Sequence, residues 1–136
     1  MAKWTRQVIG TCCLAAVAAV AGCGSHSASP SPSGVVVTED QSGQRITLSP
    51  GSTLEVRLIS NPSAGFDWQI TSPDSPVLGT PSSGFARSTS GAIGAAGTAW
   101  WKYTVQGRGT STLRLEYRRS WEASTERVFS IEVDVR

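Results

Sequence analysis

The sequence predicts an all-β domain built as a sandwich of two sheets. From residue 35 onward, apolar and polar residues alternate in several short runs, as they do on half-buried strands. Glycine, proline and asparagine residues mark the turns between these runs. No window after residue 22 sustains the period of a helix. Several short strands separated by such turns are typical of a two-sheet sandwich, which is the fold class that we expect.

Seven strands are expected in chain order. The first is the β-branched run at 35–38. The other six, in which every second residue is apolar, are expected at 46–48, 54–58, 66–70, 101–105, 113–117 and 129–135. In the third strand, for example, the three leucine and valine residues share one face, and Glu55 and Arg57 lie on the other. Alternation of this kind leaves one face of each sheet in contact with water.

Residues 73–97 are expected to be irregular. The stretch is dense in Ser, Gly, Pro and Ala, and only Val77, Leu78, Phe85 and Ile93 are available to anchor it. A connection of this length is usually functional or mobile.

The N-terminus has the features of an export signal. Lys3 and Arg6 form a short basic region, and residues 8–21 are nearly all apolar. The sequence Val-Ala-Gly-Cys at its end resembles a bacterial lipoprotein box, with cleavage before Cys23 and lipid on its thiol. We therefore expect a signal peptide at 1–22 and an exported protein, lipid-anchored to the bacterial cell membrane or envelope. The alternative is an ordinary signal peptide with a chance cysteine.

Removal of such a signal decides what the mature protein contains. Cys12 and Cys13 leave with it, so the domain has no cysteine for a disulfide, a thiolate nucleophile or a metal site. Residues 23–34 are expected to form a lipidated, Ser- and Pro-rich tether, and residues 35–136 the folded domain. Without the two basic residues of the signal, ten basic side chains face ten acidic ones, a balance that does not favour a nucleic-acid partner.

Few residues of the domain are suited to catalysis. The only histidine, His26, lies in the tether, which excludes a Ser-His-Asp or Cys-His arrangement in the folded part. The Gly-rich segment 94–97 has neither the lysine nor the helix of a phosphate loop. Most acidic residues alternate with apolar ones, although carboxylates paired across facing strands leave a glycosidase open. We expect no enzyme, no cofactor and no metal site.

Three segments combine small residues with aromatic ones. Residues 61–68 begin with the turn formers Asn-Pro and Gly, residues 94–101 lead from small residues into two tryptophans, and residues 117–122 interrupt two strands. Taken alone, the first segment is also what a hairpin turn looks like.

The tryptophans divide by their strand phase. Trp68 and Trp101 are in phase with the apolar face of their strands and are expected in the core. Trp100 has the opposite phase, so it faces away unless a bulge intervenes. Trp121 lies between two strands and is expected to be exposed in a loop, the alternative being a core or edge tryptophan that packs on its own sheet.

Together these segments resemble the chagasin-type inhibitors of papain-like cysteine peptidases. The family's first loop has the form Asn-Pro-Thr-Thr-Gly-aromatic, with a Trp one residue later, and corresponds here to Asn61, Pro62, Ser63, Ala64, Gly65, Phe66 and Trp68. The Gly-rich second loop, which runs into an aromatic strand, corresponds to Gly94, Ala95, Ala96 and Gly97. The third, Arg-Pro-Trp after a Tyr, corresponds to Arg119, Ser120 and Trp121 after Tyr117.

The resemblance implies an immunoglobulin-like antiparallel β-sandwich with the three loops at one end. It implies reversible, non-covalent inhibition, in which residues 61–65 enter the catalytic cleft and the 94–97 and 119–121 loops clamp its sides. Phe66 and Trp68 are then mainly the core that holds this wedge.

Two departures from the family's pattern bear on affinity. Ser63 keeps the hydroxyl of the first threonine, but Ala64 loses that of the second and with it a hydrogen bond to the enzyme. Ser120 replaces the proline before Trp121 and leaves that loop less rigid.

The expected partners are a papain-like cysteine peptidase and, through lipid on Cys23, a membrane. The protein is expected to be a monomer that binds no nucleic acid. The alternative is an immunoglobulin-like adhesion or envelope-binding lipoprotein that uses the same exposed aromatic residues without inhibiting a peptidase.

Overall fold

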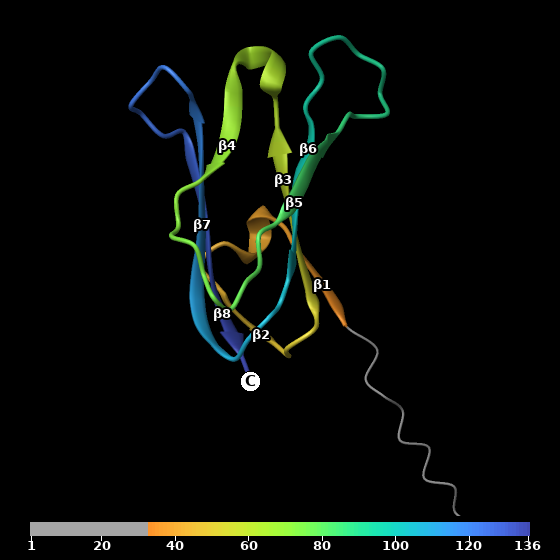
Figure 1. Cartoon of the computed structure of the whole chain (residues 1–136). Helices are drawn as coiled ribbons and strands as arrows, with labels where there is room; N and C mark the ends of the chain where they lie inside the picture. Colours follow the sequence, from red (N-terminus) through yellow and green to blue (C-terminus); the bar gives the residue numbers. More distant parts are fainter. Residues whose placement is uncertain (1–32) are drawn as a thin grey trace, which may run out of the picture.

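The computed structural model describes residues 33–136, in which two four-stranded sheets pack face to face (Figure 1). Across the first sheet the strands are β1 (Gly34–Val37), β3 (Thr53–Ser60), β6 (Gly97–Thr104) and β5 (Ser82–Ala86). Across the second sheet they are β2 (Arg45–Leu48), β8 (Arg127–Val135), β7 (Gly109–Arg119) and β4 (Phe66–Ile70). The all-β sandwich that the alternation predicts is confirmed.

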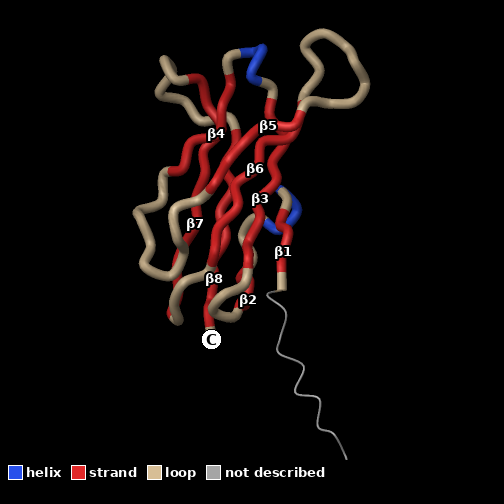
Figure 2. Tube along the Cα trace, turned by 45° about the vertical axis from the view of Figure 1, so that its right-hand side comes forward, coloured by secondary structure: helices blue, strands red, loops and turns tan. Residues whose placement is uncertain are grey.

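The helical elements of the described residues are two single turns of 3-10 helix, η1 (Glu39–Gln41) and η2 (Pro62–Ala64) (Figure 2). η1 lies at the side of the sandwich after β1, and η2 forms the tip of the connection from β3 to β4. Neither turn is long and apolar enough to cross a membrane. The expected signal at 1–22, the lipidation site Cys23 and the tether up to residue 32 lie outside the described residues.

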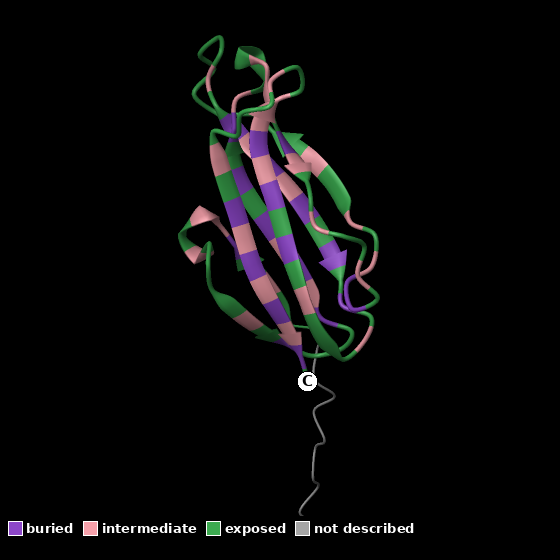
Figure 3. Ribbon diagram, turned by 90° about the vertical axis from the view of Figure 1, so that its left-hand side faces the viewer, coloured by how far each residue is buried: buried purple, intermediate pink, exposed green. Residues whose placement is uncertain are grey.

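The core lies between the two sheets and is built from the inward-facing residues of the alternating strands (Figure 3). In β8, for example, Phe129, Ile131 and Val133 are at most 1% exposed, and the residues between them are partly exposed. Burying a side chain of this size contributes roughly 1.5–3 kcal/mol relative to leaving it in water. The core is therefore large enough to hold the sandwich without a disulfide.

The strand phases of three tryptophans are confirmed. Trp68 and Trp101 are buried in the core, whereas Trp100 lies on the outer face of the first sheet. There its ring covers Gly84 of the neighbouring strand β5, where an added Cβ would lie only 2.5 Å from a ring atom. The edge strand β5 thus needs a glycine at this position because the aromatic ring occupies the space of a side chain.

Four of the six strand pairings in the described residues are antiparallel, and two are parallel, namely β1 with β3 and β2 with β8. The antiparallel arrangement that the resemblance implies therefore does not extend to β1 and β2. The physical reason is the path of the chain, because each reversal from β1 to β2 and from β2 to β3 also crosses to the other sheet. After two reversals the chain runs again in its first direction, and β3 pairs in parallel with β1.

The expectation of an irregular stretch at 73–97 was wrong in part, because it contains β5. β5 lies at the edge of its sheet and has no charged residue, and its Ser- and Gly-rich sequence resembles a loop. Val77 and Leu78 are buried anchors as expected. Phe85 is 41% exposed and Ile93 is wholly exposed, so Ile93 anchors nothing.

Candidate functional site

The three segments singled out in the sequence lie at the same end of the sandwich (Figure 1). They form the connections from β3 to β4, from β5 to β6 and from β7 to β8, and are called here the first, second and third loops (61–65, 87–96 and 120–126). The C-terminus and the start of β1 lie at the opposite end. The fold therefore presents the three loops together on a surface that the other residues of the range 33–136 leave open.

The first loop is a single tight turn. Pro62 restricts the backbone at the start of η2, and the Ala64 and Gly65 amides donate to the carbonyl oxygens of Asn61 and Pro62 at 3.1 and 2.9 Å. Gly65 ends the turn with a φ of 80°, a left-handed conformation that favours glycine. Pro62, Ser63 and Ala64 are exposed at the tip, while Asn61 and Gly65 are half-buried at its base. The sequence Asn-Pro-Ser-Ala-Gly thus builds a narrow, small-residue projection.

Hydrogen bonds within the loop and from its base hold this turn in place. The Ser63 hydroxyl donates to Asn61 Oδ1 at 2.5 Å, so it braces the loop itself. The main-chain amide of Asn61 donates to the Tyr117 hydroxyl at 2.8 Å. The ring of Tyr117 is stacked on that of Phe66, with centroids 5.2 Å apart. Phe66 is packed against the core, as expected for a residue that supports the loop.

Arg119, the last residue of β7, connects the first loop with the third. Arg119 Nε donates to the Ala64 carbonyl oxygen at 3.3 Å, and its guanidinium lies 4.3 Å above the centre of the Phe66 ring. Arg119 also forms an ion pair with Glu122 at 3.0 Å. The residue is thus engaged within the protein, where it ties the two loops together. Ser120 follows it at the exposed start of the third loop.

Trp121 is a loop residue, 71% exposed, which settles the choice between a loop and a core or edge tryptophan. Its ring nevertheless rests on the first loop, because a Cβ on Gly65 would lie 2.6 Å from Trp121 Cη2. Gly65 is therefore required twice, for its positive φ and for the close approach of the indole. A large apolar ring is thus held beside the projecting turn with most of its surface available.

The second loop makes few contacts. In the described part of the chain, the hydrogen bonds of residues 87–96 are local ones among Ser88, Ser90, Ala92 and Ala95. Gly91 and Gly94 adopt positive φ values of 67° and 78° on either side of the wholly exposed Ile93. A hollow of about 470 Å³ separates this loop from the first one.

Gly97 does not belong to this exposed surface. It is buried in β6, paired with Ser60, and an added Cβ would collide with the Ala86 carbonyl oxygen and the Phe85 ring. Its place in the Gly-rich motif therefore reflects close packing between β5 and β6. Gly94, Ala95 and Ala96 lie in the loop, with Ala95 half-buried.

Ile93 is the residue of this surface that sequence reasoning misjudged. The signal was visible, because an isolated apolar residue stands among glycine and alanine residues with no strand pattern around it. The hydrogen bond from Asn61 to the Tyr117 hydroxyl had no comparable signal, since Tyr117 is in phase with a core strand and only its tip reaches the loop.

The surface carries no constellation for catalysis. Within residues 33–136 no three His, Cys, Asp or Glu side chains gather as they would around a metal ion. Burial raises the pKa of Tyr103 to about 12, but this residue pairs with Leu54 at the far end of β3 and β6 from the loops. A projecting turn with an exposed tryptophan on one flank and a long loop on the other is suited to binding rather than to chemistry.

Comparison with known proteins agrees with this geometry. The family model described as "Chagasin family peptidase inhibitor I42" matches residues 47–133, which include all three loops. Chagasin from Trypanosoma cruzi is 32% identical over 90 residues, covering 62% of this chain and 81% of chagasin. Amoebiasin-1 from Entamoeba histolytica is 29% identical over 101 residues, covering 74% of this chain and 98% of its own.

Solved structures share the fold. The cysteine protease inhibitor EhICP2 from Entamoeba histolytica superposes with a TM-score of 0.66 at 21% identity, covering 76% of this chain and 96% of that one. Amebosin gives a TM-score of 0.62 at 28% identity, with 78% and 100% covered. The chain therefore belongs to the chagasin family of peptidase inhibitors, whose members are inhibitors rather than enzymes.

Proposed function

We propose that this protein inhibits papain-like cysteine peptidases by occupying the catalytic cleft reversibly and without a covalent bond. The first loop (61–65) is the part that enters the cleft, and the second and third loops contact its two sides. The observation that carries the proposal is the arrangement of the three family motifs around one projecting turn, at the end of the sandwich where no other element of the described residues covers them.

The first loop is suited to a narrow cleft because its tip is made of small residues. Ser63 and Ala64 bring the main chain close to the surface of the projection, so it can approach a nucleophile without a bulky side chain between. The turn is already closed by its own hydrogen bonds, and Pro62 restricts it further. Little conformational entropy is then lost on binding, which improves affinity for a given contact area.

The two flanks differ in what they offer to the walls of the cleft. Trp121 presents a large, fixed aromatic surface beside the wedge, and residues of this type dominate many binding interfaces. On the other side, the hollow of about 470 Å³ between the first and second loops has room for a wall of the cleft. The lost threonine hydroxyl at Ala64 is expected to lower affinity, whereas the structure of the turn does not depend on it.

The direct test is to titrate purified residues 24–136 against papain and a cathepsin. Reversible inhibition is expected, and binding should persist when the peptidase's active-site cysteine carries a small blocking group, because no covalent step is involved. No inhibition of any such enzyme at micromolar protein would contradict the proposal. Capture of a non-peptidase partner by a protein that inhibits none of these enzymes would instead favour the adhesion or envelope-binding alternative.

We also propose that the protein is exported by a bacterium and anchored through lipid on Cys23. The proposal is supported by the basic and apolar residues that precede Val-Ala-Gly-Cys. The start of β1 lies at the end of the sandwich opposite the loops, so a flexible tether that reaches up to about 30 Å when extended would be attached away from the loops and would not cover them.

Expression of the full chain in a bacterial host tests this anchor. Mass spectrometry of the mature N-terminus is expected to show a lipid-modified Cys23, and Cys23→Ala is expected to move the protein from the detergent-soluble membrane fraction to the aqueous one. Cleavage at another bond with an unmodified cysteine would favour the ordinary signal peptide.

A further inference from the structure

β3 is longer than the neighbour that protects its outer edge. β1 pairs with β3 only from Thr53 to Val56, and η1 then takes the chain away. The last four residues of β3 lead directly into the first loop and, in the part of the chain that the structure describes, have no strand on that side. Unpaired main-chain groups at such an edge are costly when buried and leave the strand end free to move.

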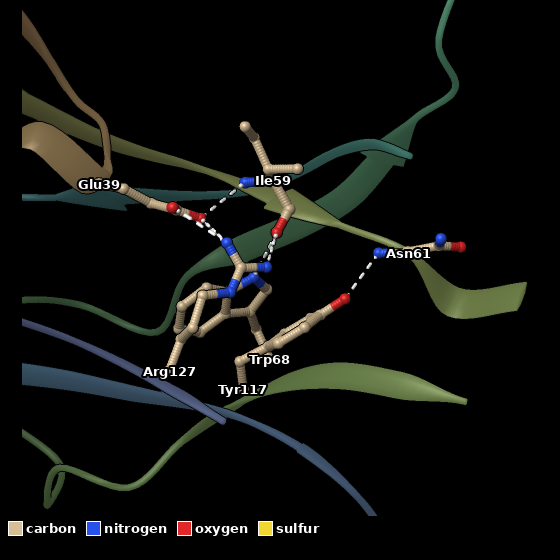
Figure 4. A network of polar contacts seen from close by, with 6 residues as sticks. All are labelled: Glu39, Ile59, Asn61, Trp68, Tyr117 and Arg127. Atoms are coloured by element: carbon tan, nitrogen blue, oxygen red, sulfur yellow. Dashed lines mark hydrogen bonds and ion pairs between the residues drawn. The ribbon is translucent and has the colours of Figure 1, made fainter. Parts of the chain in front are cut away.

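Two charged side chains fill the place of the missing strand at Ile59 (Figure 4). The Ile59 main-chain amide donates to Glu39 Oε1 at 3.2 Å, and the Ile59 carbonyl oxygen accepts from Arg127 Nη2 and from the Trp68 indole Nε1, each at 3.0 Å. Arg127 Nη1 joins the two by donating to both carboxylate oxygens of Glu39 at 2.8 and 3.0 Å. The Glu39 carboxylate accepts the hydrogen bond that the carbonyl group of a neighbouring strand would accept. The Arg127 guanidinium donates the hydrogen bond that the amide of such a strand would donate.

A side chain also accepts the next main-chain hydrogen bond along this edge, which is that of Asn61. Amides two residues apart on a strand point to the same edge, and the Asn61 amide donates to the Tyr117 hydroxyl at 2.8 Å. Arg127 pairs with Tyr117 across β7 and β8, and its guanidinium lies 4.3 Å above the tyrosine ring. The side chains that bind Ile59 and Asn61 are therefore themselves in contact (Figure 4).

We propose that Glu39, Arg127 and Tyr117 are positioning residues that form a side-chain substitute for a strand, and that this substitute sets the direction in which the first loop leaves β3. The proposal rests on the proposed function, because the first loop is the part that enters the cleft. Arg127 comes from the second sheet and β3 from the first, so the contact also fixes the loop relative to both layers.

The exposure of the Arg127–Glu39 ion pair indicates that it orients the first loop more than it stabilises the fold. The side chains of Arg127 and Glu39 are 39% and 34% exposed, and ion pairs at this exposure contribute little to the free energy of folding. The contacts of Arg127 are specific, however, because two nitrogens of one planar guanidinium donate to Glu39 and to the Ile59 carbonyl oxygen in a fixed geometry. A lysine at position 127 would keep the charge and lose that fixed pair of donors.

The experiment compares Arg127→Lys, Glu39→Ala and Glu39→Gln with the wild-type protein. Glu39→Gln keeps an oxygen that can accept from the Ile59 amide, so it is the conservative variant. The control is Glu132→Ala. It removes an exposed 2.6 Å ion pair with Arg45 in the second sheet, which also contains Arg127, at a position away from the loops. Amide hydrogen exchange at Ile59 and Asn61 is measured in the free protein, together with inhibition of papain and thermal unfolding.

We expect Glu39→Ala to speed exchange of the Ile59 amide at least tenfold and to weaken papain inhibition roughly tenfold, as the competent loop geometry becomes less populated. Arg127→Lys should have a similar effect, Glu39→Gln a smaller one and Glu132→Ala none, with unfolding midpoints within about 4 °C of one another.

Faster exchange in Glu132→Ala to the same extent, or unchanged exchange in Glu39→Ala, would overturn the proposed substitute strand. Faster exchange with unchanged inhibition would show that the edge does not position the loop for binding. If the wild-type protein failed to inhibit while exchange behaved as expected, the fault would lie with the proposed function and not with the substitute strand.

Discussion

The first and second loops lie side by side at one end of the sandwich, yet they are built in opposite ways. The first has five residues, 61–65, and is held by the Tyr117 hydroxyl, by Arg119 and by the indole of Trp121. The second has ten residues, 87–96, and its hydrogen bonds within the described chain are local. The first loop is held by contacts from outside itself, whereas we expect the second loop to become ordered only when it contacts a partner.

This difference indicates that the two loops contribute to binding in different ways. Ordering a residue costs roughly 1–2 kcal/mol of backbone entropy, so the second loop loses on binding what the first loop has lost on folding. The first and third loops, which contact one another, are therefore expected to supply most of the affinity. The second loop is expected to adapt to cleft walls of different shape.

Gly65→Ala should have the largest effect on inhibition. The substitution combines a strained positive φ with a Cβ 2.6 Å from the Trp121 ring, so it disturbs the first and third loops together. We expect a loss of about 3 kcal/mol in binding free energy, more than a hundredfold in the inhibition constant for papain.

Gly94→Ala is the matched control for this change. Gly94 has a similar φ of 78°, but its Cβ would meet only the Ser63 hydroxyl at 3.8 Å. We expect a loss of about 1 kcal/mol or less, from the backbone strain alone. Equal losses for the two glycines would break the distinction between a fixed and an adaptable loop.

Trp121→Ala tests the fixed flank directly. The ring is 71% exposed, so its removal should leave the domain folded, while the inhibition constant weakens by about 1–3 kcal/mol. Circular dichroism checks the fold and papain titration checks affinity. Unchanged inhibition would rule out Trp121 as an anchor and leave the third loop as a brace for the first.

Ile93→Ser tests the adaptable flank. Because Ile93 is wholly exposed in the free protein, we expect the free energy of unfolding to change by less than about 0.5 kcal/mol. A loss of about 1 kcal/mol in binding is expected, and it should vary between peptidases as their cleft walls differ. Val36→Ser, at an exposed apolar position on β1, is the control and should not alter inhibition. A uniform loss with every peptidase would argue against adaptation.

The sandwich could be predicted from the sequence because each strand is marked by the pattern of its own neighbouring residues. Six of the seven expected strands alternate apolar and polar residues, the first is a β-branched run, and the structure contains a strand at each place. β5 could not be found in this way, because its partner supplies what its own sequence lacks, namely the Trp100 ring over Gly84. The parallel edge pairings depend on which sheet each strand joins, which no run of residues records.

The loops show the same limit. The family motif named the residues of the first loop, but not that Arg119 would bind the Ala64 carbonyl or that Gly97 would be buried in β6. Such contacts join residues far apart in the chain, and the geometry of the fold determines them. The exposure of Trp121 could be predicted from the sequence because this residue lies outside any strand pattern.

Tyr103→Phe should have the smallest effect on inhibition, because it lies in the core at the end away from the loops. Its hydroxyl is buried and, among the described residues, has no hydrogen-bond partner, and burial raises its pKa from 10.0 to about 12. Below pH 10 the proton is bound in both the folded and the unfolded state. As the pH rises from 10 to 12 the unfolded state loses the proton first, so the free energy of unfolding should fall by up to about 3 kcal/mol.

Phenylalanine at position 103 should abolish that fall and leave stability at pH 8 equal or slightly higher, since the hydroxyl it removes is unsatisfied. Urea unfolding at pH 8 and pH 11 measures both effects as the difference between variant and wild type, because that difference cancels the titration of the other side chains. Papain inhibition at pH 7 should be unchanged. A weaker inhibitor would mean that packing at the far end of the sandwich reaches the first loop through β3 and β6, and the loop's own contacts would then no longer account for its order.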